Sequence, residues 1–147
     1  MPVLISDIKK IESVQAKFTR YLCKKLNIKF SNYTDRLNIL QLETLEIRRL
    51  KFDLILAYKI LNNYVDLDPN HFFTHSTCLE LYSLRRHQHH LQKPNLAKTA
   101  IRNNFYSYRI VNTWNQLPDK IVTANSLQSF KIQLNAINLY EFYTTKL

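Results

Sequence analysis

The sequence predicts a mainly α-helical protein, a small bundle of about five helices, for three reasons. Apolar residues recur at helical spacing in several windows of the chain. Ser, Thr or Asn residues that can cap a helix stand just before these windows. Only the region near residues 79–93 alternates as a short strand would, so an irregular or short β segment is expected there.

The 147 residues, of which 46% are apolar, are enough for one domain with a modest core. No apolar run approaches the roughly 20 residues of a membrane span, and Asp7 comes too early for a secretory signal. We therefore expect no membrane contact and an intracellular location, nuclear or cytoplasmic. The expected organisation is a single helical domain over 1–147: a basic N-terminal helix (1–30), a central helical hairpin (31–70), a basic irregular arm (71–104), C-terminal helices (105–139) and a frayed tail (140–147).

The first predicted helix spans Ser6–Leu26, with Ser6 or Asp7 as its cap. The apolar stripe expected on one face consists of Ile8, Ile11, Val14 or Gln15, Phe18 and Leu22. The cations that lie mostly off this stripe are Lys9, Lys10, Lys17, Arg20, Lys24 and Lys25. They form either a solvated polar face or a face that follows a nucleic-acid backbone.

Two helices are predicted in the middle of the chain, a short one over Tyr33–Leu40 and a longer one over Leu45–Asn62 that Thr44 caps. The candidate caps of the short helix are Ser31, Asn32 and Thr34. The longer helix is apolar around much of its circumference, which predicts a place at the centre of the bundle. Its Asp53, four residues after Arg49, is interpreted as an ion-pair partner, because no second carboxylate stands at a spacing suited to acid–base catalysis.

The segment Phe105–Pro118 is predicted to form one amphipathic helix with a defined end. Asn115 can take the left-handed backbone there, Leu117 can fold back on the last turn, and Pro118 prevents continuation. The expected apolar face holds Phe105, Tyr108, Val111 and either Asn112 or Trp114. We expect structural roles for Trp114, Asn115, Leu117 and Pro118.

The remaining segments are predicted from residues that typically begin or end a helix. Pro118–Thr123 is a turn or a short helix, and Ser126 caps a last helix over Leu127–Leu139. The tail Tyr140–Leu147 is expected to fray. Pro94 prevents a helix through the basic arm.

The net charge of +10 is unevenly distributed. Residues 1–30 carry seven Lys and Arg against two acids, a net +5, and residues 71–147 carry nine against three, a net +6. The middle, residues 31–70, carries five against six and is nearly neutral. Two basic flanks favour an anionic partner, most often a nucleic acid, although basic charge also serves solubility.

Several catalytic and metal chemistries are disfavoured. The chain has no glycine, which excludes Gly-rich phosphate loops. Cys23, on a Lys-rich helix, has no identifiable His or Asn base, so Cys23 and Cys78 are interpreted as free buried thiols. The ligand set from which a zinc site could be composed is His71, His75, Cys78, His87, His89 and His90. Its second pair lacks a cysteine, so we expect no metal, no cofactor and no catalytic residue.

Cations interleaved with aromatic residues form the strongest candidate site, because cations neutralise phosphates and aromatic rings stack on exposed bases. The expected backbone contacts are Arg85, Arg86, Lys93, Lys98, Arg102 and Arg109, with Tyr106 as the stacking residue. A second expected set is Lys9, Lys10, Lys17 and Arg20. The alternative is that the aromatic residues of this region belong to the core and that Arg109 is a surface or salt-bridged residue.

Four stretches in fixed order carry a resemblance to a known family: Asp7–Leu22, Tyr33–Asn63, Leu84–Pro94 and Phe105–Lys131. Over about Asp7–Leu134 the chain resembles the C-terminal, post-palm and thumb-side region of non-LTR retrotransposon reverse transcriptases of the jockey and CR1 type. The two most specific motifs are IE-x-VQ-x-x-FTR, residues 11–20, and R-x-x-x-x-WN-x-LP, residues 109–118.

The resemblance implies an RNA-directed DNA polymerase as parent, but the paired aspartates of its Y/F-x-D-D turn are absent from this sequence. Arg85-Arg86-His87 also stands where the family has an Arg-Gly-His step. What is implied is a non-catalytic fragment that helps to grip RNA or the template–primer, with RNA or DNA as partner and little sequence preference. Two alternatives stay open: a packing or scaffold module that contacts a separate or missing polymerase core, and a non-functional relic of a decayed element.

Overall fold

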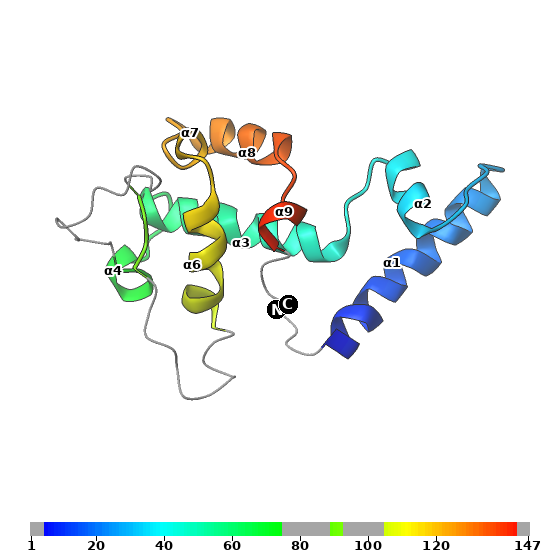
Figure 1. Cartoon of the computed structure of the whole chain (residues 1–147), viewed down its shortest axis with the longest axis horizontal. Coiled ribbons are helices and arrows are strands. Elements are labelled where there is room, and N and C mark those ends of the chain that lie inside the picture. The colour runs from blue at the N-terminus through cyan, green and yellow to red at the C-terminus, as the bar shows by residue number, and fades with distance from the viewer. Residues whose placement is uncertain (1–4, 75–88, 93–104, 144–147) are drawn as a thin grey trace. The chain divides into compact units, whose positions relative to one another are not determined.

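A computed structural model describes residues 5–74, 89–92 and 105–143, and every regular element in these ranges is a helix (Figure 1). The mainly α-helical prediction is therefore confirmed. The described ranges contain eight helices rather than about five, since three single turns of four residues add to the longer helices. The chain divides into two compact units, Met1–Leu50 (unit 1) and Lys51–Leu147 (unit 2), and each is described by itself. The expectation of one domain over 1–147 stays a prediction.

Helices α1 (Ile5–Lys25) and α2 (Tyr33–Ile39) lie side by side in unit 1 (Figure 1). The residues of α1 that are buried are Thr19 and Cys23. The predicted apolar stripe is wrong as a continuous packing face: Ile11, Val14 and Phe18 are 38%, 67% and 60% exposed, whereas Ile8, Gln15 and Leu22 are partly buried. The small and polar residues of the neighbouring face allow α2 to approach closely, and Gln15, Thr19 and Ala16 form hydrogen bonds with it.

Non-glycine residues in the left-handed region end the first three helices, including α3 (Leu45–Leu61). They are Asn27 (φ 54°), Gln41 (φ 53°) and Asn63 (φ 56°). In each case the following amide donates to the carbonyl five positions back: Ile28 to Cys23 (2.9 Å), Leu42 to Leu37 (2.8 Å) and Tyr64 to Lys59 (2.8 Å). Glycine usually occupies this position of the Schellman closure, and a chain without glycine uses Asn and Gln.

Three predicted N-caps are confirmed, and one of the three candidates at α2 is selected. The caps accept a hydrogen bond from the amide three residues on: Asn32 Oδ1 from Asp35 (2.9 Å), Thr44 Oγ1 from Ile47 (3.3 Å) and Ser126 Oγ from Ser129 (3.1 Å). Helix α8 (Leu127–Ala136) ends before the predicted Leu139, because Ile137 leaves the helical region with ψ 150°.

The core of unit 2 forms around α6 (Tyr106–Gln116) and the part of α3 beyond Lys51. Trp114 is 1% exposed, and its ring centroid lies 6.1 Å from that of Phe130 on α8. Tyr58 of α3 stacks on Phe130 at 4.3 Å, and its hydroxyl donates to the Ala124 carbonyl at 2.5 Å. Aromatic packing therefore joins α3, α6 and α8.

The end of α6 differs from the prediction. Phe105 is 64% exposed at the N-cap, and of the two alternatives for the apolar face Trp114 is buried, whereas Asn112 is exposed. The left-handed backbone predicted for Asn115 is wrong, because this residue lies within the helix. Its side-chain amide instead pairs with the backbone of Leu91, accepting from the N–H at 2.9 Å and donating to the carbonyl at 2.8 Å.

Leu117 is buried after α6, and Pro118 is the N-cap of α7 (Asp119–Val122), as the predicted turn or short helix requires. Helix α4 (Pro69–Phe72) begins after Asp68, whose side chain accepts from the Asn70 amide.

Two further expectations fall partly outside the described residues. The tail was expected to fray, but Tyr140–Tyr143 forms α9, and residues 144–147 lie outside the description. Of the expected β segment only residues 89–92 are described; they hold no strand, only a single bridge at Leu91. The Gln92 amide donates to the Thr74 carbonyl at 2.7 Å. Within the described ranges, no helix combines the length and the apolarity that crossing a membrane requires.

Candidate nucleic-acid interface

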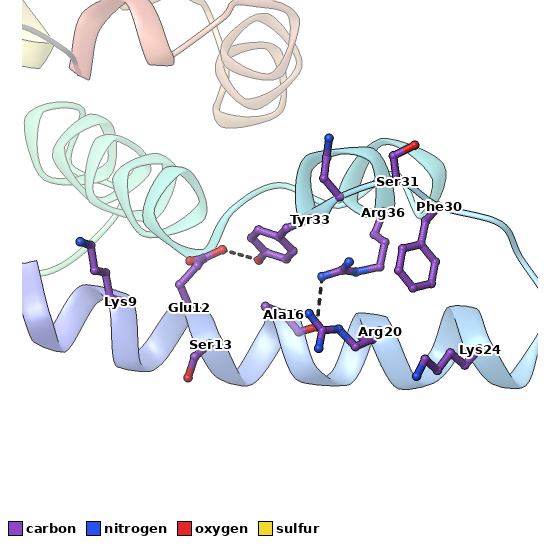
Figure 2. A pocket seen from close by; sticks show the side chains of 11 residues that line it. Lys9, Glu12, Ser13, Ala16, Arg20, Lys24, Phe30, Ser31, Tyr33 and Arg36 are labelled. Carbon is purple, nitrogen blue, oxygen red and sulfur yellow. Dashed lines mark hydrogen bonds between the residues drawn. The ribbon is translucent and has the colours of Figure 1, made fainter.

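A groove of about 540 Å³ lies between α1 and α2 in unit 1 (Figure 2). Its charged lining consists of Lys9, Arg20, Lys24 and Arg36, with Glu12 as the one carboxylate. Phe30 and Tyr33 supply aromatic surface. We call this feature the α1–α2 groove. A hollow with these residues combines an excess of positive charge with rings, as single-stranded nucleic acids require.

The spacing along α1 explains why its cations converge on the groove. Lys9, Ser13, Ala16, Arg20 and Lys24 are separated by four, three, four and four residues, which places them on one face of a helix. Lys9 and Lys24 stand toward opposite ends of the groove in Figure 2. The α1 contribution is therefore a row of cations with small side chains between them.

Glu12 fixes one end of the groove. Its carboxylate accepts hydrogen bonds from the Tyr33 hydroxyl (2.5 Å) and from the Leu45 amide (3.0 Å), where a negative charge is favourable at the start of α3. Gln15 donates to the same hydroxyl (3.2 Å) and to the Glu43 carbonyl (2.8 Å). Burial, and then the hydrogen bond to Glu12, raise the pKa of Tyr33 to about 12. This network ties α1, α2 and the start of α3 together within unit 1.

Arg36 lies at the floor of the groove and is 3% exposed. Its guanidinium carbon lies 4.8 Å from the Phe30 ring centroid and 5.4 Å from that of Tyr33, distances at which cation–π attraction acts. Nε donates to Thr19 Oγ1 and Nη2 to the Ala16 carbonyl, both at 3.4 Å. Figure 2 shows the side chain reaching from α2 toward α1 with a ring on either side. Within the described residues no carboxylate pairs with it.

Only half of the second predicted set of contacts lines the groove. Lys9 and Arg20 line it, whereas Lys10 and Lys17 do not. Lys10 lies 3.6 Å from Asp7 in an exposed pair, which contributes little to stability. Whether any of these four contacts a nucleic acid stays a prediction.

Arg109 and Tyr106, both predicted contacts, are engaged with α3 in unit 2. Arg109 forms a bidentate pair with Asp53 at 3.0 to 3.1 Å, and the side chains are 16% and 17% exposed. The Tyr106 hydroxyl donates to the Asp53 carbonyl at 2.9 Å, and burial, followed by the charge of Asp53, raises the pKa of Tyr106. Asp53 is thus an ion-pair partner as predicted, but with Arg109 instead of Arg49. The Arg49 Nε and Nη2 atoms are buried and have no hydrogen-bond partner among the residues that the structure describes.

The other predicted contacts, Arg85, Arg86, Lys93, Lys98 and Arg102, lie outside the described residues. The same holds for His75, Cys78 and His87 of the considered zinc set. Within the described ranges no group of three His, Cys, Asp or Glu residues is placed to hold a metal ion. Cys23 is a buried free thiol, as predicted.

A second hollow, of about 580 Å³, lies along residues 63–69 in unit 2. Asp66 and Asp68 line it, and Asp68 also lies 3.9 Å from His71. Its acidic lining makes it a poor site for a phosphate.

The sequence prediction did not include Phe30, Tyr33 and Arg36 among the contacts, and it named Lys24 only as one of the α1 cations that could follow a nucleic-acid backbone. Tyr33 and Arg36 stand three residues apart, the spacing that places two side chains on one face of a helix. Lys24 follows Arg20 by four residues for the same reason. These spacings were the available signal, but their meaning depends on α2 packing beside α1. Comparison of the chain with known protein families, with curated proteins and with solved structures finds no match.

Proposed function

We propose that this chain is a non-catalytic module that binds RNA or DNA through backbone contacts with little sequence preference. The observation that carries the proposal is the α1–α2 groove, where four cations and two aromatic residues face one hollow against a single carboxylate. Glu12, the one carboxylate of the lining, is held at one end by the Tyr33 hydroxyl and the Leu45 amide, so the positive charge of the lining exceeds the negative charge.

The charge of the whole chain supports the same proposal. A net +10 concentrated in two flanks attracts polyanions at long range, and the cations in the groove supply contacts at short range. Cations of the arm, from Arg85 to Arg102, would add contacts to those of the groove.

We further propose that the module descends from the C-terminal region of a non-LTR retrotransposon reverse transcriptase. Motif order is the sole support for this descent. Several residues of the two most specific motifs have packing roles: Glu12 and Gln15 join the helices of unit 1, and Trp114 and Asn115 hold residues 89 and 91. Such roles are consistent with a module whose fold, instead of an active site, is retained.

A direct binding measurement tests the proposal. The full chain is titrated against a labelled single-stranded RNA of about 20 nucleotides and read by fluorescence anisotropy at several salt concentrations. Backbone contacts predict micromolar affinity at low salt, and a steep loss of affinity as salt rises from about 50 to 200 mM. Absence of binding below about 100 µM at low salt would exclude the proposal.

One observation favours a second candidate, a packing module that contacts another protein. The stripe of α1 formed by Ile11, Val14, Phe18 and Tyr21 is exposed, with Tyr21 62% exposed. Such a stripe is typical of a helix that packs against a partner. Light scattering in the same titration separates the candidates, because a monomer that binds RNA favours the first and self-association without RNA binding favours the second.

A further inference from the structure

We propose that the α1–α2 groove contains a discrete phosphate site centred on Arg36, a more specific claim that rests on the proposed nucleic-acid binding. The first argument is the burial of an uncompensated charge. Arg36 as a whole residue is 3% exposed, so its side chain has lost most of its hydration, yet no carboxylate neutralises its charge within the described residues. Its hydrogen bonds, at 3.4 Å to a hydroxyl and a carbonyl, are long, and both acceptors are neutral.

Arg109 shows how the same chain treats a partly buried arginine whose role is packing. The Arg109 side chain is 16% exposed, and its guanidinium makes a bidentate pair with Asp53 at 3.0 Å. Arg36 is more deeply buried and receives two aromatic rings instead of a carboxylate. The rings hold the guanidinium plane in place without cancelling its charge. The side chain of Arg36 is therefore held in a fixed orientation, as that of Arg109 is, but its positive charge is left for an anionic ligand to neutralise.

The groove supplies further donors at one end. Arg20 and Lys24 are exposed on successive turns of α1 and line the same hollow as Arg36. Lys24 and Phe30 stand together at the end of the groove away from Glu12 (Figure 2). A phosphate at this end meets three cations, whereas the opposite end carries the carboxylate. A planar guanidinium beside point charges from lysine is the combination that recognises phosphate oxygens.

The ligand chemistry is thus a phosphate group, which could belong to a phosphodiester inside a strand or to a terminal phosphate monoester. The groove has a volume of about 540 Å³, which is in the range of small-ligand pockets. Binding there therefore needs only one phosphate group and not a duplex. Oligonucleotides with and without a 5′-phosphate distinguish the two sources. Tighter binding of the phosphorylated strand assigns the site to a terminal group, and equal binding through Arg36 assigns it to the backbone.

The test uses the full chain with inorganic phosphate as the probe, against sodium chloride at equal ionic strength. We expect phosphate to shift the Arg36 side-chain Nε–H resonance in NMR spectra and to raise the melting temperature. Arg36→Lys keeps the charge but loses the stacked fork, and we expect its affinity for phosphate to fall about tenfold. Arg48→Gln removes one exposed charge of unit 1 outside the groove and should change the affinity less than about twofold.

Arg36→Met, which removes the charge, is a second variant whose phosphate affinity is measured only if circular dichroism shows native helix content. If it does not fold, Arg36→Lys alone is the test. Equal phosphate affinity in the wild type and in Arg36→Lys, or no phosphate binding by the wild type, would overturn the site. If RNA binding persists in that case, the proposed function stands without the site. If phosphate binds through Arg36 but RNA does not bind, the site stands and the nucleic-acid proposal fails.

Discussion

Arginines of this chain illustrate what decides a residue's role. Arg109 is paired with Asp53, and Arg36 lies within cation–π distance of Phe30 and Tyr33. Arg49 has two buried nitrogens with no hydrogen-bond partner in the described part of the chain. Sequence spacing favoured a pair between Arg49 and Asp53, because four residues separate them on one helix. The structure pairs Asp53 with a residue 56 positions away, since a bidentate contact across the core of unit 2 is available there. Sequence spacing therefore indicates which residues could form an ion pair, and tertiary packing determines which pair forms.

The Asp53–Arg109 pair should couple strongly. We expect Asp53→Asn and Arg109→Met each to lower the free energy of unfolding by about 2 kcal/mol, because each leaves a largely buried charge without its partner. The double variant should lose clearly less than the sum of the two single losses. Urea unfolding followed by the fluorescence of Trp114, a core residue of unit 2, measures all three. Additive losses would show that the pair does not interact energetically.

Tyr33 predicts a pH dependence of unit 1. Its pKa is raised to about 12 from an ordinary 10.0, so the folded state favours the neutral phenol. Its contribution to stability is therefore complete below about pH 10 and is lost as the pH rises toward 12. Alkaline titration of phenolate absorbance in the wild type minus that in Tyr33→Phe isolates this group. A difference midpoint near pH 10 would contradict the burial and the Glu12 hydrogen bond that raise the pKa.

At the scale of the helix, N-terminal caps were more predictable than C-terminal ends or packing faces. Caps form where a side chain bonds to a nearby amide, so the sequence alone identified Thr44 and Ser126 and narrowed the cap of α2 to three candidates that include Asn32. The face that α1 packs depends on which partner reaches it, and the more apolar stripe at Val14 and Phe18 stays exposed. The hydrogen-bonding face was harder to find from sequence because it is less apolar than the stripe.

The left-handed residues at helix ends provide a test at this scale. Gln41 has φ 53° and closes α2, a position that glycine adopts without the steric cost of a Cβ atom. Gln41→Gly removes the steric cost of the left-handed backbone but increases the conformational entropy of the unfolded chain. We expect the first effect to be larger, so that the free energy of unfolding of unit 1 rises by about 0.5 to 1 kcal/mol. Chemical denaturation followed by circular dichroism measures it, with Gln41→Ala as the matched control. A stabilisation by alanine equal to that by glycine would contradict the account.

For the molecule as a whole, helical spacing predicted the class of fold and composition the sign of the charge, but neither predicted the location of the candidate site. Helical periodicity and caps sufficed for the longer helices, whereas single turns such as α9 are too short to have a period. The groove joins α1 to residues that follow a turn at Asn27, so it exists only once α2 lies beside α1. Lys9 and Arg20 could be named from the charge of α1, but Phe30 and Arg36 required the packing.

The most direct test of the central claim compares two double variants that remove the same charge from the same helix. Arg20→Gln/Lys24→Gln acts inside the α1–α2 groove, and Lys10→Gln/Lys17→Gln acts outside it. RNA affinity is measured against salt concentration for both and for the wild type. We expect the groove variant to bind at least about tenfold more weakly at low salt and to lose about 1.4 units of the salt slope, the value for two single-strand phosphate contacts, while the other variant changes little. Equal losses in the two variants would show that net charge alone, and not the groove, binds the nucleic acid.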